Sequence, residues 1–312
     1  MFKETISICI LTYNRIECLK RQLIHLTNID YDNLELIVVD NCSSDNTQQI
    51  MENDFNDIVY IRTATNLGAA ARNIGIKRAS GNIIITLDDD IIGLTKDCIL
   101  RIVDKFSTSA KLGIINFKII NHINYEICNW VHHCKQELFS EEEFLTYEIT
   151  EGAVAFRKEI FDKVGYYPDH FFISHEGLDL ALRTIDMGYC IIYFPHVTVI
   201  HFHSDLGRKS WYNYYYDTRN LFLIAARYFP VSHALAYLSR GLISMFLYSV
   251  RDGYCKSCLK AIKDGLVFIR SVKGQRKVLK PETMKFIHEI DKRKPSLFYL
   301  IKKRLFAKSA RL

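Results

Sequence analysis

The first half of the chain alternates nearly continuous apolar runs with amphipathic stretches. A strand buried on both faces reads as a continuous apolar run, whereas apolar residues three or four apart indicate one face of a helix. This pattern predicts strands at residues 6–13, 34–40, 58–62 and 83–87, separated by helices at 16–26, 45–52 and 69–79. Strand–helix repeats favour parallel pairing with right-handed crossovers. We therefore expect residues 1–100 to form a doubly wound α/β unit.

The second half continues the alternation less regularly. Strands are predicted at residues 112–120, 153–156, 190–194 and 197–202, and helices at 158–164 and 178–186. Beyond residue 210 the pattern becomes helical and aromatic. The expected organisation is an α/β domain over residues 1–210, with halves 1–100 and 101–210, followed by a helical, basic extension over 211–312.

Composition narrows the class of protein. A hydrophobic content of 49% and a charged content of 24% are typical of a globular chain. The nine cysteines form no repeating framework, which favours a reducing cytoplasm over a disulfide scaffold. A strand begins near the first residue, so we expect no signal peptide. Cys128, His132, His133 and Cys134 are metal-ligand types, but their spacing fits no standard zinc finger.

The charge is unevenly distributed along the chain. Residues 251–312 contain 18 Lys and Arg against 5 Asp and Glu, whereas the preceding residues contain 23 against 30. Such asymmetry indicates an anionic partner surface, either membrane or nucleic acid. No recognised nucleic-acid-binding motif accompanies the charge, so we expect no nucleic acid and favour an anionic membrane surface.

The C-terminal region contains one segment long enough to cross a membrane. Residues 231–250 are mostly apolar, but His233 and Arg240 interrupt them, and a central arginine is costly in hydrocarbon. We expect an amphipathic helix against the core or the membrane surface. Residues 273–280 and 293–311 supply basic charge, each Lys or Arg being worth about 1 kcal/mol near anionic headgroups.

The most informative motif is the strand at residues 83–87, which runs directly into Asp88, Asp89 and Asp90. Three adjacent carboxylates repel one another unless a cation or a basic partner lies among them. Mg²⁺ is usually bound by one or two carboxylates together with substrate phosphates. Open α/β sheets bind ligands at the carboxyl ends of their strands. The motif therefore predicts a metal–nucleotide site, with an acid-rich helix N-terminus as the alternative.

Other polar residues are expected at the same edge of the sheet. Thr12 and Asn14 follow the first strand, Asp40 ends the second, and Arg72 lies in the first turns of the third predicted helix. Oxygen atoms and exposed N–H groups at such positions suit a nucleotide, and arginine suits a phosphate. Each residue alone has a structural explanation, as a cap or a surface charge. Their recurrence at one edge favours a nucleotide site.

These motifs, in this order, resemble the inverting family-2 glycosyltransferases of the GT-A fold. The resemblance covers roughly residues 5–230 and includes Thr12-Tyr13-Asn14-Arg15, Val39-Asp40-Asn41, Asn66-x-Gly68, Ala71-Arg72-Asn73 and Leu87-Asp88-Asp89-Asp90. It implies an α/β GT-A fold, with a mostly parallel central sheet, and a C-terminal helical extension. It implies a nucleotide pocket formed by Thr12, Tyr13, Asn14, Arg15, Asp40, Asn66, Gly68, Arg72, Asp88 and Asp89. The donor would be a UDP-, dTDP- or GDP-linked sugar.

The resemblance also implies metal ligands and a base. Mn²⁺ or Mg²⁺ would be held by Asp88, Asp90 and His201, with His203 left open as the alternative histidine. Residues 175–183 resemble the stretch E-D-x-D-L-x-x-R, which carries the catalytic base. This chain departs from that form, because Gly177 stands where the second acid is common. Glu176 is therefore the expected base and Asp179 the reserve, although Asp179 could instead pair with Arg183.

The resemblance implies a metal-dependent, inverting transfer of one sugar to a hydroxyl acceptor, as in bacterial surface-polysaccharide and rhamnosyltransferase-like members. A lipid-linked saccharide is the expected acceptor, and the inner face of the membrane the expected peripheral location. A nucleotidyltransferase is a weaker alternative, because residues 12–15 form no glycine-rich phosphate loop. A catalytically impaired nucleotide-sugar-binding protein also stays open because of Gly177. The donor sugar, the linkage and the oligomeric state do not follow from the sequence.

Overall fold

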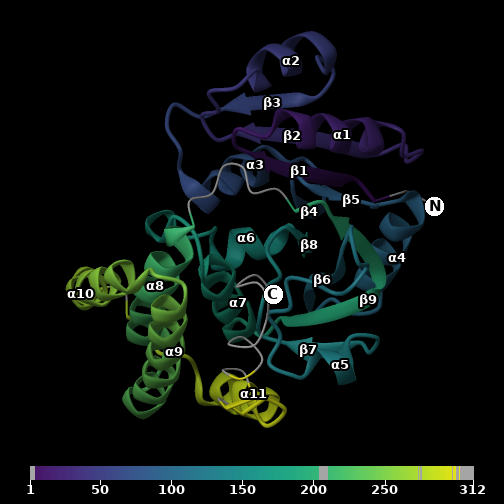
Figure 1. Cartoon of the computed structure of the whole chain (residues 1–312). Helices are drawn as coiled ribbons and strands as arrows, with labels where there is room; N and C mark the ends of the chain where they lie inside the picture. The colour runs from purple at the N-terminus through teal and green to yellow at the C-terminus, as the bar shows by residue number, and fades with distance from the viewer. Residues whose placement is uncertain are drawn as a thin grey trace.

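The computed structural model describes residues 4–203, 210–272, 274, 276–296, 298, 299 and 302. Its centre is one mixed sheet in the order β3-β2-β1-β4-β8-β6-β9-β5, with β7 paired to β9 (Figure 1). The strands are β1 (Ile6–Thr12), β2 (Leu34–Asp40), β3 (Val59–Arg62), β4 (Ile83–Asp88), β5 (Ile91–Ile92), β6 (Leu112–Asn121), β7 (Phe144–Thr146), β8 (Ala153–Arg157) and β9 (Cys190–His201).

The pairing confirms the α/β prediction. β3, β2, β1 and β4 pair in parallel, as the strand–helix repeats predicted. β8 then runs antiparallel between β4 and β6, while β6 and β9 are parallel. Every parallel strand of the first half ends at the same edge of the sheet, which is the edge where the polar residues were expected.

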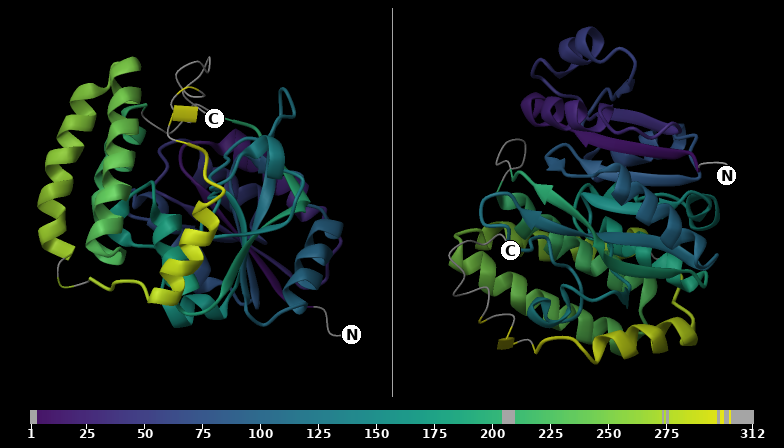
Figure 2. Two further views of the ribbon diagram at one scale, coloured as in Figure 1. Left: turned by 90° about the horizontal axis from the view of Figure 1, so that it is seen from below. Right: turned by 90° about the vertical axis from the view of Figure 1, so that its right-hand side faces the viewer.

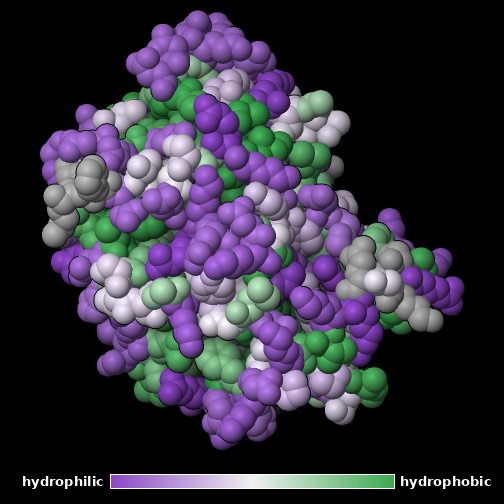
Figure 3. Space-filling view, turned by 180° about the vertical axis from the view of Figure 1, so that it is seen from behind, coloured by the Kyte–Doolittle hydropathy of each residue, from purple (hydrophilic) through white to green (hydrophobic). Residues whose placement is uncertain are grey.

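Helices cover both faces of this sheet. They are α1 (Ile16–Thr27), α2 (Thr47–Asp54), the 3₁₀ helix η1 (Gly68–Ala71), α3 (Arg72–Arg78), α4 (Lys96–Ser107), α5 (Gln136–Phe139), α6 (Glu159–Val164), η2 (Asp169–Phe171) and α7 (Glu176–Asp186). Successive residues of a strand point to opposite faces, so Ile8 packs into the core beneath α1 and α4 while Cys9 packs into the core beneath α3 and α7. Seen from behind, the α2 end of the molecule is hydrophilic (Figure 3).

Two local predictions were wrong in detail, and one alternative is excluded. The helix predicted at residues 69–79 is split into η1 and α3, and η1 begins at Gly68, which has a φ of +64° and where a Cβ would lie 2.0 Å from the carbonyl oxygen of Phe172. The acids after β4 precede β5, which pairs with β9, so the helix alternative is excluded. The two strands predicted at residues 190–202 form the single strand β9.

The C-terminal region is helical, as predicted. It contains α8 (Trp211–Tyr228), α9 (Val231–Arg251), α10 (Cys255–Val272) and α11 (Pro281–Asp291). Figures 1 and 2 show α8, α9 and α10 lying side by side next to the α/β body, with α11 returning beneath it. Within the described ranges, the structure contains no helix with the length and apolar character needed to span a membrane.

Part of the basic charge predicted for the C-terminal region is used to attach this region to the body. Lys280 donates from its backbone N–H and its Nζ to Asp186, over 2.8 and 2.6 Å. Arg276 makes a contact within the C-terminal region itself, since it donates to the carbonyl oxygen of Phe229, at the end of α8, over 3.0 Å. Lys273 and residues 303–311, which belong to the predicted basic segments, lie outside the described residues. All nine cysteines are free thiols.

Candidate active site

Three successive carboxylates lie at the end of β4, at the edge of the sheet where β1 and β2 also end. β4 ends at Asp88, and Asp89 and Asp90 form the turn into β5. The end of β1 lies beside them, so that Thr12 donates a hydrogen bond to Asp89 over 2.7 Å. Parallel pairing thus brings together residues that are 77 positions apart in the sequence.

Two arginines neutralise these carboxylates. Arg15 Nη1 lies 3.0 Å from Asp89 Oδ1 and 2.9 Å from Asp90 Oδ2. Arg72 Nη2 lies 2.5 Å from Asp88 Oδ1. Burial raises the pKa of Asp89 to about 7, although Arg15 opposes the rise. The basic partners that three adjacent acids require are therefore supplied by two of the predicted nucleotide-site residues.

The other residues predicted for the nucleotide pocket form the loops around this edge. Asp40 is fully buried and accepts hydrogen bonds from the backbone N–H of Ser43 over 2.8 Å and from the hydroxyl of Tyr60 over 2.7 Å. The remaining members are half-buried, namely Tyr13, Asn14 and Asn66 in loops and Gly68 at the start of η1. Asn14 accepts a hydrogen bond from the backbone N–H of Ser44, and Asp40 anchors the loop after β2.

The geometry fits a divalent cation at Asp90. Asp90 Oδ1 is buried, accepts no hydrogen bond, and lies 3.3 Å from His201 Nε2. Burial disfavours the imidazolium, but Asp90 and Cys128 outweigh it and raise the pKa of His201 to about 10. A carboxylate and an imidazole together suit Mn²⁺, which substrate phosphates can ligate further.

The three predicted metal ligands, Asp88, Asp90 and His201, do not all contact one another. Among the residues that the structure describes, no group of three or more His, Cys, Asp or Glu side chains is arranged to hold a metal. Asp90 and His201 face each other, whereas Asp88 pairs with Arg72. His203 is exposed, in contrast to His201, which is 9% exposed. Of the two candidate histidines, His201 contacts Asp90, and the ring of His203 lies 5.1 Å from that of His201.

The cysteine and histidine cluster near residue 130 does not form a zinc site either. His132 contacts the hydroxyl of Thr146, and burial lowers the pKa of its imidazole to about 3. His133 lies between Asp291 of α11 and Glu148, at 2.8 and 2.9 Å. These contacts show that the two adjacent histidines have separate structural roles, and that His133 attaches α11 to the body.

The expected base, Glu176, is the first residue of α7 and is 4% exposed. The loop before it is strained, because Phe172, Ser174 and His175 all have positive φ angles although none is glycine. Such backbone conformations cost free energy and persist only where neighbouring groups enforce them. The position of Glu176 therefore depends on whatever holds this loop.

Residues of α8 hold the loop, and the sequence pattern did not reveal this. Asn220 Nδ2 donates to the carbonyl oxygens of Phe171, Ile173 and Ser174 over 3.2, 2.9 and 2.7 Å. Arg219 donates to the carbonyl oxygen of Phe171 over 2.8 Å. The aromatic and basic helix α8 thus packs on the core and fixes the loop that precedes Glu176 (the base loop).

Asp179, the alternative candidate for the base, has a structural role. It is 1% exposed and accepts hydrogen bonds from Arg183 over 2.7 and 2.9 Å, which confirms the predicted pairing. It also accepts from Arg227 over 2.7 Å and from the hydroxyl of Tyr228 over 2.5 Å. An acid with all its lone pairs engaged is poorly placed to take a substrate proton.

One further carboxylate, absent from the sequence-based site, joins this group. Glu151 precedes β8, and its Oε2 accepts a hydrogen bond from the hydroxyl of Tyr167 over 3.3 Å. Burial raises the pKa of Glu151 to about 8; Arg72 opposes the rise, and Glu176 and Asp88 add to it. The segment Glu151-Gly152-Ala153 resembles the acceptor-side loop of family-2 glycosyltransferases, but that resemblance gave Glu151 no role of its own.

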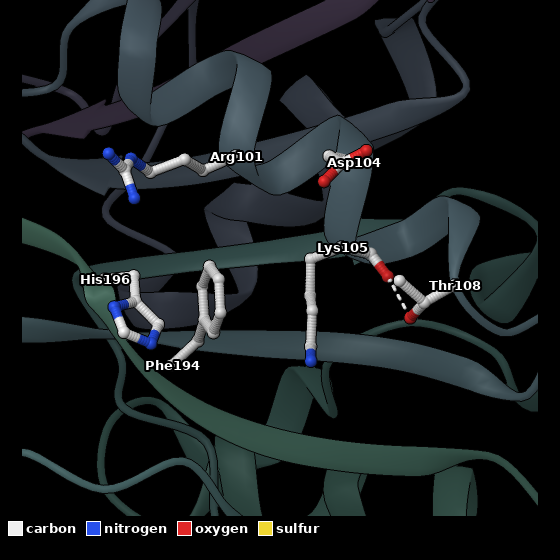
Figure 4. Close-up of a pocket in the computed structure, with 6 residues that line it drawn as sticks. All are labelled: Arg101, Asp104, Lys105, Thr108, Phe194 and His196. Atoms are coloured by element: carbon white, nitrogen blue, oxygen red, sulfur yellow. Dashed lines mark hydrogen bonds between the residues drawn. The ribbon is translucent and has the colours of Figure 1, made fainter.

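A hollow on the surface lies away from these residues. It has a volume of about 330 Å³ and is formed by Arg101, Asp104, Lys105 and Thr108 of α4 with Phe194 and His196 of β9. Figure 4 shows these six side chains, none of which was predicted for the site. His201, at the other end of β9, is the part of that strand beside the carboxylates.

Comparison with known sequences identifies related proteins. Residues 7–165 match the sequence model described as Glycosyl transferase family 2. An uncharacterised protein of Haemophilus influenzae is 29% identical over 178 residues, covering 53% of this chain and 94% of the relative. The O-antigen chain rhamnosyltransferase WbaN of Salmonella anatum is 22% identical over 191 residues, covering 58% of this chain and 60% of the relative.

A solved structure shows the same fold. The mannosyltransferase PcManGT from Pyrobaculum calidifontis, in complex with GDP-Man and Mn²⁺, aligns over 99% of this chain and 89% of its own. The TM-score is 0.55 at 16% sequence identity. This likeness covers the sheet and the helical extension together, and the shared architecture is the α/β GT-A fold.

Proposed function

The chain belongs to glycosyl transferase family 2, and we propose that it transfers one sugar from a nucleotide donor to a hydroxyl acceptor, with inversion at the anomeric carbon and with a divalent cation. Glycosyltransferase activity with a nucleotide-sugar donor follows from the family. The requirement for a cation, the inversion of stereochemistry and the nature of the acceptor are our proposals.

The single observation that carries the proposal is the arrangement at the ends of β1 and β4. Thr12, Arg15 and Arg72 converge there on three carboxylates, at the edge where an open α/β sheet binds its ligand. Arginine binds phosphate oxygens as readily as carboxylate oxygens. Arg15 and Arg72 are therefore positioned to exchange part of their contacts for a donor diphosphate.

Asp90 and His201 would hold the cation. A bound divalent cation stabilises the negative charge that develops on the departing nucleoside diphosphate. Asp90 offers a buried oxygen that accepts no hydrogen bond, and His201 offers Nε2 beside it. Arg15 neutralises the other oxygen of Asp90 and so limits the negative charge of the site.

The reaction also needs a carboxylate near the acceptor hydroxyl. In an inverting transfer the acceptor oxygen attacks the anomeric carbon from the face opposite the diphosphate, and one base removes its proton. The start of α7 and the donor edge are linked through residues 151 and 152, because Glu151 lies against Gly177 while Gly152 lies against Asp88, the partner of Arg72. The start of α7 is thus close enough to the donor edge to serve one reaction centre.

A panel of UDP-, GDP- and dTDP-linked sugars with Mn²⁺, Mg²⁺ or EDTA tests the proposal. We expect turnover with at least one donor, loss of turnover in EDTA, and a product whose anomeric configuration, read by NMR, is opposite to that of the donor. Asp90→Ala should reduce turnover strongly. Turnover that is undiminished in EDTA, or a product with retained configuration, would contradict the corresponding part of the proposal.

We further propose a lipid-linked acceptor at an anionic membrane surface, as part of polysaccharide synthesis. On α10, the exposed apolar residues Leu259, Leu266 and Val267 alternate with the exposed basic residues Lys256, Lys260, Lys263 and Arg270. On α9, further apolar residues are exposed, namely Val231, Leu235, Ile243, Phe246, Leu247 and Val250. Apolar side chains next to basic ones suit an anionic bilayer interface.

Vesicle co-sedimentation tests this surface. We expect binding to vesicles that contain phosphatidylglycerol at low salt, and weaker binding at high salt because surface charge is screened. Lys256→Gln combined with Lys260→Gln and Lys263→Gln should weaken binding further. Equal binding to phosphatidylcholine vesicles, or none to either, would contradict a role for this basic face.

A further inference from the structure

Position 177 departs from the motif that its segment resembles, and another residue fills the space. Gly177 is the second residue of α7 and directly follows Glu176. A Cβ atom added at Gly177 would lie 2.3 Å from Oε1 of Glu151 and 3.2 Å from its Cδ. Non-bonded heavy atoms do not approach so closely in a packed interior. The carboxylate of Glu151 therefore occupies the place that a side chain at position 177 would take.

Glu151 connects the two halves of the proposed reaction centre. Its Oε1 is buried and accepts no hydrogen bond. The next residue, Gly152, has a φ of +99°, and a Cβ there would lie 2.9 Å from Oδ2 of Asp88. Residues 151 and 152 thus contact the start of α7 on one side and the first acid after β4 on the other.

The charges around Glu151 suit a proton acceptor. Burial and the neighbouring carboxylates of Glu176 and Asp88 favour a bound proton, whereas the guanidinium of Arg72 favours its loss. A carboxyl group in such a balance can accept a proton and release it in each catalytic cycle. An acid that keeps one oxygen without a hydrogen bond can offer that oxygen to a substrate hydroxyl.

We propose that Glu151 is the catalytic base, in the role that the motif assigns to an acid at position 177. The proposal rests on the proposed sugar transfer. The acceptor oxygen forms a bond to the anomeric carbon, and the bond from that carbon to the diphosphate oxygen breaks, leaving its electron pair on the diphosphate. Oε1 of Glu151 takes the proton of the acceptor hydroxyl. Glu176 then acts as a positioning residue, whose charge raises the basicity of Glu151.

The first test removes the base without changing its shape. Glu151→Gln should lower kcat by about 10²- to 10⁴-fold, the usual contribution of a general base. Its dissociation constant for UDP or GDP with Mn²⁺, by titration calorimetry, should stay within about threefold of wild type, because the diphosphate is held elsewhere. Glu176→Gln should lower kcat less than Glu151→Gln does. A Glu151→Gln enzyme with wild-type kcat would overturn the proposal.

The second test moves the carboxylate back to position 177. Gly177→Asp alone should be inactive, since its side chain collides with Glu151. Glu151→Ala removes that obstacle, so the double variant Glu151→Ala/Gly177→Asp should regain at least tenfold in kcat over Glu151→Ala. The matched control, Glu151→Ala/Gly177→Asn, has the same shape without the charge and should show no recovery.

The outcomes separate this inference from the proposed function. If wild type transfers sugar and the Asp and Asn double variants recover equally, Glu151 has only a packing role and the inference is wrong. If wild type transfers sugar from no donor in the panel, the proposed function fails and the inference fails with it. Circular dichroism melts show whether each variant folds. If a double variant does not fold, the kcat of the isosteric Glu151→Gln variant alone decides whether Glu151 is the base.

Discussion

The pairing of Arg15 with two buried carboxylates leads to a prediction about stability. Asp89 and Asp90 are 2% and 3% exposed, and Arg15 contacts one oxygen of each over 3.0 and 2.9 Å. Arg15→Met keeps the length and the apolar stem of the side chain and removes its charge. Both carboxylates then remain buried in a medium where an uncompensated charge is costly.

The expected decrease in the free energy of unfolding of Arg15→Met follows from the contacts that the two carboxylates keep. Removing one partner of a buried ion pair typically costs about 3–5 kcal/mol. Asp89 keeps the hydrogen bond from Thr12 and Asp90 keeps the neighbouring His201, so we expect the lower end, about 3 kcal/mol. Added Mn²⁺ should recover part of this loss, and should stabilise the variant more than wild type, because it replaces the missing positive charge.

Urea unfolding with and without Mn²⁺ measures both effects. The control is Arg101→Gln, which breaks an exposed pair with Asp97 on α4 and should leave the unfolding midpoint unchanged within error. If Arg15→Met unfolds at the same urea concentration as wild type, the two acids are not held by Arg15. If Mn²⁺ stabilises wild type and the variant equally, the cation does not occupy this cluster.

Two further predictions concern the attachments of α11 and of the base loop. Burial opposes the imidazolium of His133, but Asp291 and Glu148 outweigh it and raise its pKa, so its stabilisation is complete below the unfolded pKa and is lost as pH rises through the folded value. Thermal melts should therefore separate wild type from His133→Gln most at acidic pH, and the difference should shrink as the pH rises above the ordinary pKa of histidine; a constant difference would contradict this. Asn220→Ala removes the side-chain donor to the carbonyls of Ile173 and Ser174, whereas that of Phe171 keeps Arg219, and should cost about 1–3 kcal/mol. It should also lower kcat more than nucleotide affinity, and an unchanged kcat would show that the loop holds its shape without α8.

Local sequence patterns were sufficient to predict much of the fold. The apolar runs located the parallel strands of the first half within one or two residues, because strands buried on both faces leave few positions for polar residues. The i,i+4 spacing of Asp179 and Arg183 also predicted a contact that forms. The start of this segment at Gly68 was missed, since it depends on the approach of Phe172 to Gly68 rather than on helix propensity.

The parts of the site that escaped prediction depend on distant residues. Glu151 gains significance only because the backbone at Gly177 approaches it, and no local pattern encodes that contact. Asn220 lies in an aromatic, basic helix that also fits a membrane interface, and only the folded chain shows its amide on the base loop. The acids after β4 were located by pattern, but their pairing with Arg15 and Arg72 required the packing of α1 and α3 beside them.

The central claim is that the acids after β4 hold a cation against the diphosphate of a sugar donor. Titration calorimetry of UDP, GDP and dTDP with wild type and with Asp90→Asn, in Mn²⁺ and in EDTA, tests it most directly. We expect at least one nucleotide to bind wild type about tenfold more tightly in Mn²⁺, and Asp90→Asn to lose that gain. Equal affinity in Mn²⁺ and EDTA, or a full Mn²⁺ gain in Asp90→Asn, would contradict the claim.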